Sequence, residues 1–377
     1  MVKSFFVTTF RNLLRRKTFV LINVVGLIVG LSAFITLFLF TSYEESYDTF
    51  PGSEHVSRIK SIHVNENGAE RESVLSPFGA GPDIKDAFPE VEAYTRIIKT
   101  VALIQYRNSW IKSEDAAYVD EGFFKVFSLP LLEGNVNLAL TQINTMVISA
   151  SFAKKIFGDE NPVGKQINYK GRLLYEVTGV FPDFPNNSHM KFDALLSMQN
   201  YVAVQPFMLS EPWSWYNPVT YLRLGPGVEH VSLEEKLEVL IDEKIGEDLR
   251  LAKDKLSFEL QPVRSIHLQS NYEGELRKNG DGELVRYLEY IALAIFLLAL
   301  INYASLSSAK SIERSREIGI RKLLGSQRYQ VIVQFMGESF IMHLMAVSLA
   351  VLVIAVTQQY WPEYFLSSEQ LLQVPAQ

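Results

Sequence analysis

The sequence has no cysteine, which excludes disulfide bonds, a thiolate metal site and a cysteine nucleophile. Its six histidines are scattered and form no H-E-x-x-H pattern, so no zinc-protease signature is present. The segment Gly158–Lys165 (GDENPVGK) superficially resembles a phosphate-binding loop. Five residues separate its glycines instead of four, and Gln166 replaces the Ser or Thr that would bind magnesium. We therefore reject this segment as a nucleotide site.

Charge is absent from three long apolar blocks, which span residues Thr18–Tyr43, Tyr290–Ala309 and Ser339–Pro362. A helix crosses the bilayer core in about 20 residues, so each block is long enough to span it and too long for an ordinary core helix. The first block is also longer than the roughly 7–15 apolar residues of a signal peptide and lacks its small-residue cleavage site. Gly26 and Gly30 form a small-xxx-small spacing, which lets membrane helices approach closely.

Basic residues next to these blocks predict the orientation of the chain. Residues 1–17 carry five Lys or Arg and no acid, and residues 309–330 carry six Lys or Arg against two acids. Both segments are expected on the cytoplasmic side. The region between the first two blocks, residues 42–286, holds 25 Lys and Arg against 36 Asp and Glu, and is expected outside the membrane.

The outside region mixes strand and helix patterns and predicts an α+β domain. A capping box at Ser232 and Glu235 precedes an apolar helical stripe, and a shorter helix is expected at Ala150–Phe157, ending at Gly158. The stripe consists of Leu233, Leu237, Leu240, Ile241 and Ile245. Alternating strand patterns are found at Arg58–Val64, Val101–Tyr106, Tyr175–Val180, Val219–Leu224 and Leu256–Gln261.

Two groups of side chains in this domain could form a site. Asp183, His189 and Asp193 could bind a metal or act as acid–base groups, but turn capping and surface polarity are the favoured interpretation. An aromatic group could stack on a ligand, although a structural role is more common for such a cluster. It consists of Trp213, Trp215 and Tyr216.

Three segments carry a resemblance to a known family. Arg316–Gly325 (REIGIRKLLG) closely resembles the signature of ABC transporter permeases of the MacB/FtsX/LolC type. Residues 157–196 resemble the late part of the MacB-like periplasmic core domain, and residues 5–30 match the opening of the family. With gaps, the resemblance extends from residue 1 to about residue 360.

This resemblance implies a permease subunit without cofactor of its own, which pairs with an ABC ATP-binding subunit that carries ATP and magnesium. ATP-driven dimerisation of that subunit would move the transmembrane helices and, through them, the periplasmic domain, a process called mechanotransmission. A second permease copy or half, the lipid bilayer and periplasmic or outer-membrane partners are also implied; nucleic acid is not. The residues that would contact the ATP-binding subunit are Arg316, Glu317, Ile318, Gly319, Arg321, Lys322, Leu324 and Gly325.

The expected fold is therefore an α-helical transmembrane bundle with a large α+β extracytoplasmic domain between spans one and two, in a multi-pass protein of a bacterial inner membrane. The family usually has four spans, so we expect the chain to be a fragment, the first half of a longer Bacteroidetes-like permease. The expected parts are a cytoplasmic segment (1–17), span one (18–43), the periplasmic core domain (44–286), span two (287–309), the coupling helix region (310–334), span three (335–360) and an extracytoplasmic tail (361–377). Within the coupling region, a short helix along the membrane is expected to follow an extension of span two.

Two other classes of protein compete with this interpretation. A membrane-anchored sensor or binding protein would not need the REIGIRKLLG element, and would more often carry a signalling domain after its last span. A membrane-tethered hydrolase would need a nucleophile–base or paired-carboxylate pattern, and we find none. Among ABC-type functions, export or efflux of a peptide or antibiotic, release of lipoproteins and activation of cell-wall hydrolases all remain open.

Overall fold

The structure is a computed structural model that describes residues 17–323 and 328–360. They divide into a helical unit, up to Ser46 and from Gly282 onward, and an α+β unit, Tyr47–Asp281. Each unit has its own interior, and each is described by itself.

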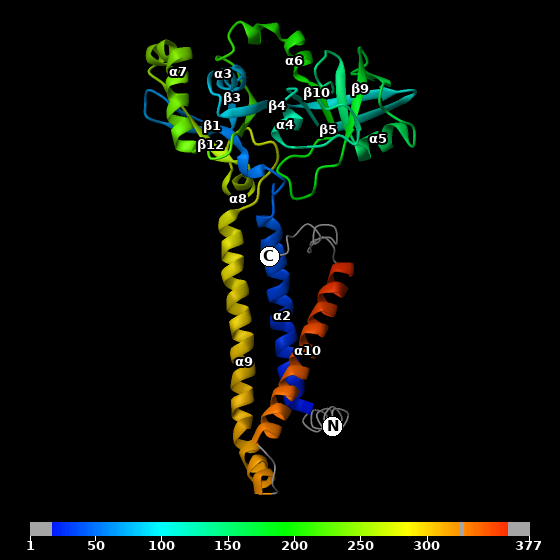
Figure 1. The fold of residues 1–377 in the computed structure, drawn as a ribbon, viewed down its shortest axis with the longest axis vertical. Helices are drawn as coiled ribbons and strands as arrows, with labels where there is room; N and C mark the ends of the chain where they lie inside the picture. Colours follow the sequence, from blue (N-terminus) through cyan, green and yellow to red (C-terminus); the bar gives the residue numbers. More distant parts are fainter. Residues whose placement is uncertain (1–16, 324–327, 361–377) are drawn as a thin grey trace. The chain divides into compact units, whose positions relative to one another are not determined.

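Three long helices form the helical unit: α2 (Lys17–Glu45), α9 (Gly282–Leu323) and α10 (Arg328–Tyr360) (Figure 1). α2 packs against both α9 and α10. Each helix contains a segment that is long and apolar enough to cross a membrane, namely Leu21–Glu45, Gly282–Ser305 and Ser339–Thr357. The three predicted transmembrane helices are thus confirmed in the described part of the chain.

The α+β unit is built on one mixed sheet in which twelve described strands take part. Its main path runs β12-β1-β11-β4-β5-β10-β7-β9-β6, while β2 pairs with β1, β3 with β11, and β8 with both β4 and β9. The strands are β1 (Val56–Val64), β2 (Glu70–Ser73), β3 (Leu75–Pro77), β4 (Val91–Tyr106), β5 (Ser109–Val119), β6 (Glu133–Gly134), β7 (Thr145–Ser149), β8 (Gln166–Tyr169), β9 (Leu173–Phe181), β10 (Ala194–Ser197), β11 (Tyr216–Leu224) and β12 (Lys255–Pro262). All five predicted strand segments lie within these strands, and the α+β class is confirmed.

The described helices of this unit, of which only α7 is long, lie between the strands or next to the first and last of them: η1 (Ser53–His55), α3 (Ala80–Ala87), α4 (Phe123–Val126), α5 (Ala150–Phe157), α6 (Met198–Val204), η2 (Pro206–Leu209), α7 (His230–Ala252), η3 (Val263–Ser265) and α8 (Ile266–Gln269). α5 has the predicted bounds because Ser149 caps its first turn, accepting a hydrogen bond from the Phe152 amide, and Gly158 ends it with φ 65°.

The predicted capping box of α7 is wrong. The helix begins two residues before Ser232, at His230, and its N-cap residue Glu229 makes no side-chain capping bond. Glu235 therefore lies inside the helix, where it cannot act as the partner of a cap. The apolar stripe, in contrast, is correct: Leu233, Leu237, Leu240 and Ile241 are buried, and Ile245 is partly buried beside them.

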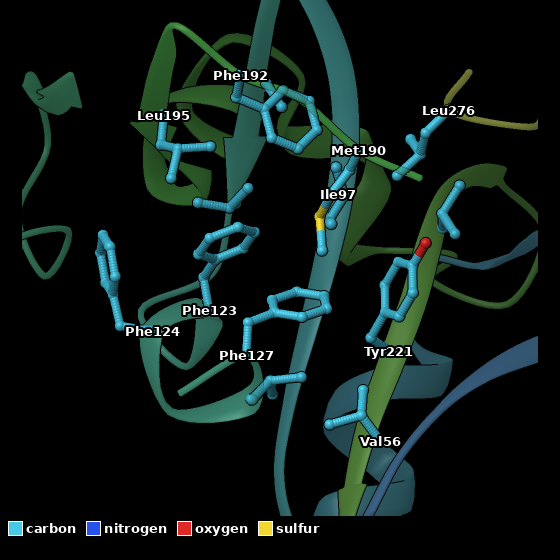
Figure 2. Close-up of a cluster of buried hydrophobic side chains, with 14 of the residues drawn as sticks. Val56, Ile97, Phe123, Phe124, Phe127, Met190, Phe192, Leu195, Tyr221 and Leu276 are labelled. Atoms are coloured by element: carbon cyan, nitrogen blue, oxygen red, sulfur yellow. The ribbon is translucent and has the colours of Figure 1, made fainter. Parts of the chain in front are cut away.

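The central core of the sheet collects aromatic side chains from segments far apart in the sequence (Figure 2). Phe123, Phe124 and Phe127 come from α4 and the residue after it, and they pack with Tyr221 of β11 and Ile97 of β4. The Phe127 and Tyr221 rings meet edge to face at 5.1 Å. Two further clusters lie toward the β8–β9 end of the sheet and under α3 and α7.

Candidate functional site

The predicted coupling residues fall at the end of α9. Arg316, Glu317, Ile318, Gly319, Arg321 and Lys322 belong to this helix, and Leu324 and Gly325 lie outside the described residues. Among these positions the structure describes the surroundings of Gly319: a Cβ placed there would meet no atom within 4 Å. The backbone at Gly319 is therefore open to a partner.

Two apolar side chains next to Gly319 are also exposed. Ile320 is 61% exposed and Leu323 is 89% exposed. Residues three or four positions apart share a helix face, so Gly319, Ile320 and Leu323 form one small apolar surface, here called the α9 end surface. An exposed apolar surface of this kind fits a contact with lipid or with another protein.

The structure differs from the predicted separate helix in the coupling region. α9 continues without a break through 42 residues, and residues 310–323 extend the second span as one helix. Gly319 does not interrupt it, because a single glycine in a helix costs only about 1 kcal/mol relative to alanine. The next described helix, α10, begins at Arg328.

The small residues of α2 lie where α2 meets α9, in agreement with the small-xxx-small interpretation. A Cβ on Gly30 would be 2.6 Å from the Ala299 Cβ, and one on Gly26 would be 2.9 Å from the Asn302 Nδ2 atom. Both distances are shorter than ordinary contacts, and at Gly30 the Ala299 Cα and the Ile295 carbonyl oxygen also lie within 4 Å of that position, so the helix backbones approach closely there.

The polar residues that could have formed a metal or acid–base site have three separate roles. Asp183 accepts hydrogen bonds from the Ser151 amide and hydroxyl at the start of α5, and Asp193 accepts one from Ser113 Oγ at 2.6 Å. His189 is buried between Asp48 and Tyr221. No group of three potential metal ligands occurs among residues 17–323 and 328–360. The capping interpretation fits Asp183; Asp193 instead binds a side chain of β5, and the burial of His189 was not predicted.

The GDENPVGK segment forms an ion-paired turn. Glu160 lies within ion-pair distance of Lys165 and, at 2.7 Å, of Arg107. These contacts engage the lysine that a phosphate-binding loop would direct to its ligand.

The aromatic group divides between the core and the surface. Trp213 is 6% exposed, donates a hydrogen bond from Nε1 to Asp83 at 2.7 Å and stacks on Phe258. Trp215 is exposed and meets Phe207 edge to face at 4.9 Å. The structural interpretation is correct for Trp213.

Two cavities of the α+β unit escaped the sequence-based reasoning. One has a volume of about 430 Å³ and is lined by residues that include Lys85, Tyr94 and Glu121. The other has a volume of about 490 Å³, and its lining includes His63 and Tyr216, whose rings meet at 4.9 Å. Burial lowers the pKa of His63, and the nearby Arg71 lowers it further. The residues that line each cavity come from separate segments of the chain, so no local sequence motif predicts these cavities.

Three helices long and apolar enough to span a membrane, with an α+β domain between the first and second, define a multi-pass membrane protein with a large domain outside the bilayer. Comparison with known proteins then identifies its family. Residues 20–240 match the model of the MacB-like periplasmic core domain, and residues 290–375 match the FtsX-like permease C-terminal model. The chain belongs to the MacB/FtsX family of ABC transporter permeases.

Relatives agree with this assignment. The macrolide export ATP-binding/permease protein MacB of Salmonella choleraesuis is 23% identical over 284 residues, which are 73% of this chain and 40% of that protein. The chain thus corresponds to about two fifths of the length of that relative. The ABC transporter permease YvrN of Bacillus subtilis, itself uncharacterised, is 22% identical over 89% of this chain and 82% of its own length.

Solved structures include similar domains. A domain of a permease protein from Porphyromonas gingivalis covers 63% of this chain and 98% of its own, with 24% identity and a TM-score of 0.48. The periplasmic region of MacB from Actinobacillus actinomycetemcomitans covers 59% of this chain and 92% of its own, with 15% identity and a TM-score of 0.40.

Proposed function

We propose that this chain is a non-catalytic permease subunit that couples ATP hydrolysis on a separate ATP-binding subunit to movement of its own extracytoplasmic domain. ATP and magnesium would bind to that subunit, and the α9 end surface would contact it. The observation that carries the proposal is the continuity of α9, which begins one residue after the last residue of the α+β unit and ends at Leu323.

A continuous helix is suited to transmitting displacement over a distance. At 1.5 Å per residue, the 42 residues of α9 correspond to a length of about 63 Å, twice the thickness of the bilayer core. A loop between the span and the coupling residues would absorb part of any movement. In a single helix, a push at the α9 end surface is passed along the helix axis.

The chain that connects α2 to the domain is also short. α2 ends at Glu45, and Asp48 is already buried in the α+β unit. Few residues therefore separate α2 from the domain, which supports movement of the domain with this helix.

Under this proposal the basic N-terminal segment and the basic residues 309–330 would lie in the cytoplasm, and the domain in the periplasm of a bacterial inner membrane. Two copies or halves would work together, as in the family. The name of the Salmonella relative favours export, and the substrate would be a peptide, an antibiotic or a lipoprotein-like molecule.

The proposal is tested by copurification of an ATP-binding subunit from membranes that contain the full chain. Two variants are expected to abolish copurification while the amount of permease stays normal. One is Leu323→Asp, and the other combines Glu317→Ala with Arg321→Ala. Leu251→Asp is the matched control, because Leu251 is 78% exposed at the end of α7 in the other unit. Copurification with the control but not with Leu323→Asp supports the proposal. If no ATP-binding subunit copurifies with the parent chain, the proposal fails and a sensor function gains support.

A further inference from the structure

A series of buried and partly buried polar side chains runs between the two ends of the α+β unit. At the first end, His189 Nδ1 lies 2.9 Å from Asp48 Oδ1, and His189 Nε2 shares a 2.7 Å hydrogen bond with the Tyr221 hydroxyl. Asp48, His189 and Tyr221 are 4%, 3% and 0% exposed. The Ser188 hydroxyl and the His189 amide also donate to Asp48. The first residues of the α+β unit, here called the entry segment, are thus fixed by the buried carboxylate of Asp48.

Tyr221 connects this group to the other end of the unit. Tyr221 of β11 and Arg58 of β1 are directly opposite in the sheet. Burial raises the pKa of the Tyr221 phenol, and the positive charge of the nearby Arg58 guanidinium partly offsets this rise. Arg58 has no exposed surface and donates to both carboxylate oxygens of Glu275, at 2.7 and 3.0 Å.

Arg58 also fixes the segment around Glu275. Its Nη2 atom donates to Ser270 Oγ at 2.7 Å and to Gln261 Oε1 at 2.6 Å. Burial opposes ionisation of Glu275, but hydrogen bonds and the charge of Arg58 outweigh this effect and hold its pKa below the usual value. Glu275 lies six residues before the end of the unit at Asp281.

A second contact joins the same two ends. The Tyr47 and His267 rings stack with centroids 3.3 Å apart and an interplanar angle of 4°. The His267 carbonyl accepts a hydrogen bond from the Gly280 amide at 2.9 Å. Tyr47 is the first residue of the unit, so this stack brings the entry directly against the exit segment.

Stability alone does not call for such an arrangement. Buried ion pairs often contribute no more than apolar residues of the same volume, whereas removing one partner is strongly destabilising. What a buried, hydrogen-bonded group of polar side chains provides is a fixed geometry between its ends. Here the ends are the points at which the domain joins α2 and α9.

We propose that Asp48, His189, Tyr221, Arg58 and Glu275 form a clamp that makes the entry and exit of the extracytoplasmic domain one rigid body. These are positioning residues: under the proposed function, on which this role rests, the clamp makes the sheet follow both connected helices together. Without the clamp, the segment after α2 and the segment before α9 would move independently, and the domain would not follow the movement of the helices.

The experiment perturbs one end of the clamp and measures the other. Asp48 has φ 57°, a conformation that asparagine adopts readily, so Asp48→Asn removes the charge without backbone strain. Hydrogen exchange is measured by mass spectrometry on the full chain in lipid nanodiscs. The expected result is exchange about tenfold faster or more in residues 273–280, although Asp48 contacts none of them directly. Tyr221→Phe is expected to accelerate exchange at both residues 47–50 and 273–280.

Tyr169→Phe is the matched control for Tyr221→Phe. Tyr169 is 2% exposed and donates to the Val101 carbonyl at 3.3 Å, so the variant also removes a buried hydrogen-bonded hydroxyl. It is expected to leave both end segments unchanged within about twofold. The clamp is refuted if Asp48→Asn affects only the entry segment, or if the two Tyr→Phe variants behave alike.

Two further readouts separate the clamp from the proposed function. Because the chain has no cysteine, spin labels can be placed at Pro51→Cys and Lys278→Cys on an otherwise unlabelled background. A narrow distance distribution in the parent that broadens in Tyr221→Phe supports the clamp, and an equally broad distribution in the parent contradicts it. Copurification of the ATP-binding subunit should be the same in both; its loss from the parent would contradict the proposed function and leave the exchange result standing.

Discussion

The contact between α2 and α9 at Gly30 makes a sharp prediction about the helical unit. Replacing Gly30 by alanine places a Cβ 2.6 Å from the Ala299 Cβ, whereas carbon atoms in contact normally lie about 3.5–4.0 Å apart. The helices must separate by about 1 Å, which removes favourable packing along their contact. In a membrane this packing is a main source of helix association. We expect Gly30→Ala to lower the free energy of unfolding by about 1–3 kcal/mol.

The same substitution at other glycines provides the internal controls. A Cβ on Gly26 meets the end of the Asn302 side chain, which can move, so Gly26→Ala should cost less than Gly30→Ala. A Cβ on Gly319 meets nothing within 4 Å, and Gly319→Ala should be neutral or stabilising by up to about 1 kcal/mol, because alanine favours helix.

Unfolding of the purified chain in detergent micelles, titrated with dodecyl sulfate, measures these differences. Ala299→Gly should restore much of the stability that Gly30→Ala removes, because it deletes the atom in the clash. Equal stability of Gly30→Ala and Gly319→Ala, or no restoration by Ala299→Gly, would refute the reasoning from close approach.

Three further predictions concern the α+β unit. Phe123→Ala should lower the free energy of unfolding by about 3–5 kcal/mol, as measured by urea denaturation, because Phe123 is fully buried at the centre of the aromatic core. Asp120→Asn should lower the free energy of unfolding by about 3 kcal/mol or more in the same assay, because Asp120 pairs with the buried Arg96 through both carboxylate oxygens, at 2.7 and 2.9 Å. Asp242→Asn, which breaks an exposed pair with Arg250, should lower it by less than about 1 kcal/mol. Burial raises the pKa of Tyr216 to about 12, so the unfolded chain loses this proton first and stability falls as the pH rises from about 10 to 12. Between pH 9 and 11, ionisation of Tyr216 alone should lower the free energy of unfolding by roughly 1 kcal/mol. The free energy of unfolding of Tyr216→Phe should therefore fall by that much less than that of the parent over the same pH range.

Sequence patterns predict the parts of this fold that depend on local periodicity. The uncharged blocks identify the membrane helices, and strand alternation identifies segments in β1, β4, β9, β11 and β12. α5 can also be predicted from the sequence alone, since Ser149 caps its first turn and Gly158 ends it. At α7 the periodic stripe gives the buried face correctly, but the start of the helix cannot be read from a capping motif that the chain does not use.

Features made by distant segments could not be predicted in this way. The function of His189 depends on Asp48 and Tyr221, which are 141 and 32 residues away along the chain. Asp48 and His189 lie in loops and Tyr221 in β11, so their contact depends on the tertiary fold, which periodicity does not encode. The coupling region shows the opposite error, because a separate short helix was expected after the extension of span two, whereas one helix continues through Leu323.

The continuity of α9 and the buried clamp impose the same requirement at two points of the chain. A force applied at the α9 end surface reaches the domain only if α9 stays straight and the segment that joins α9 to the domain stays rigid. α9 meets the first condition through uninterrupted backbone hydrogen bonding over 42 residues. The second depends on side chains, because the segment after α8 (Ile266–Gln269) is largely irregular up to Gly282, and its carbonyl and carboxylate groups are held by Arg58, Lys99 and Asn279. A weakened clamp should therefore leave binding of an ATP-binding partner intact and uncouple the domain, whereas a change at Leu323 should do the reverse, leaving the domain firmly attached to a helix that nothing drives.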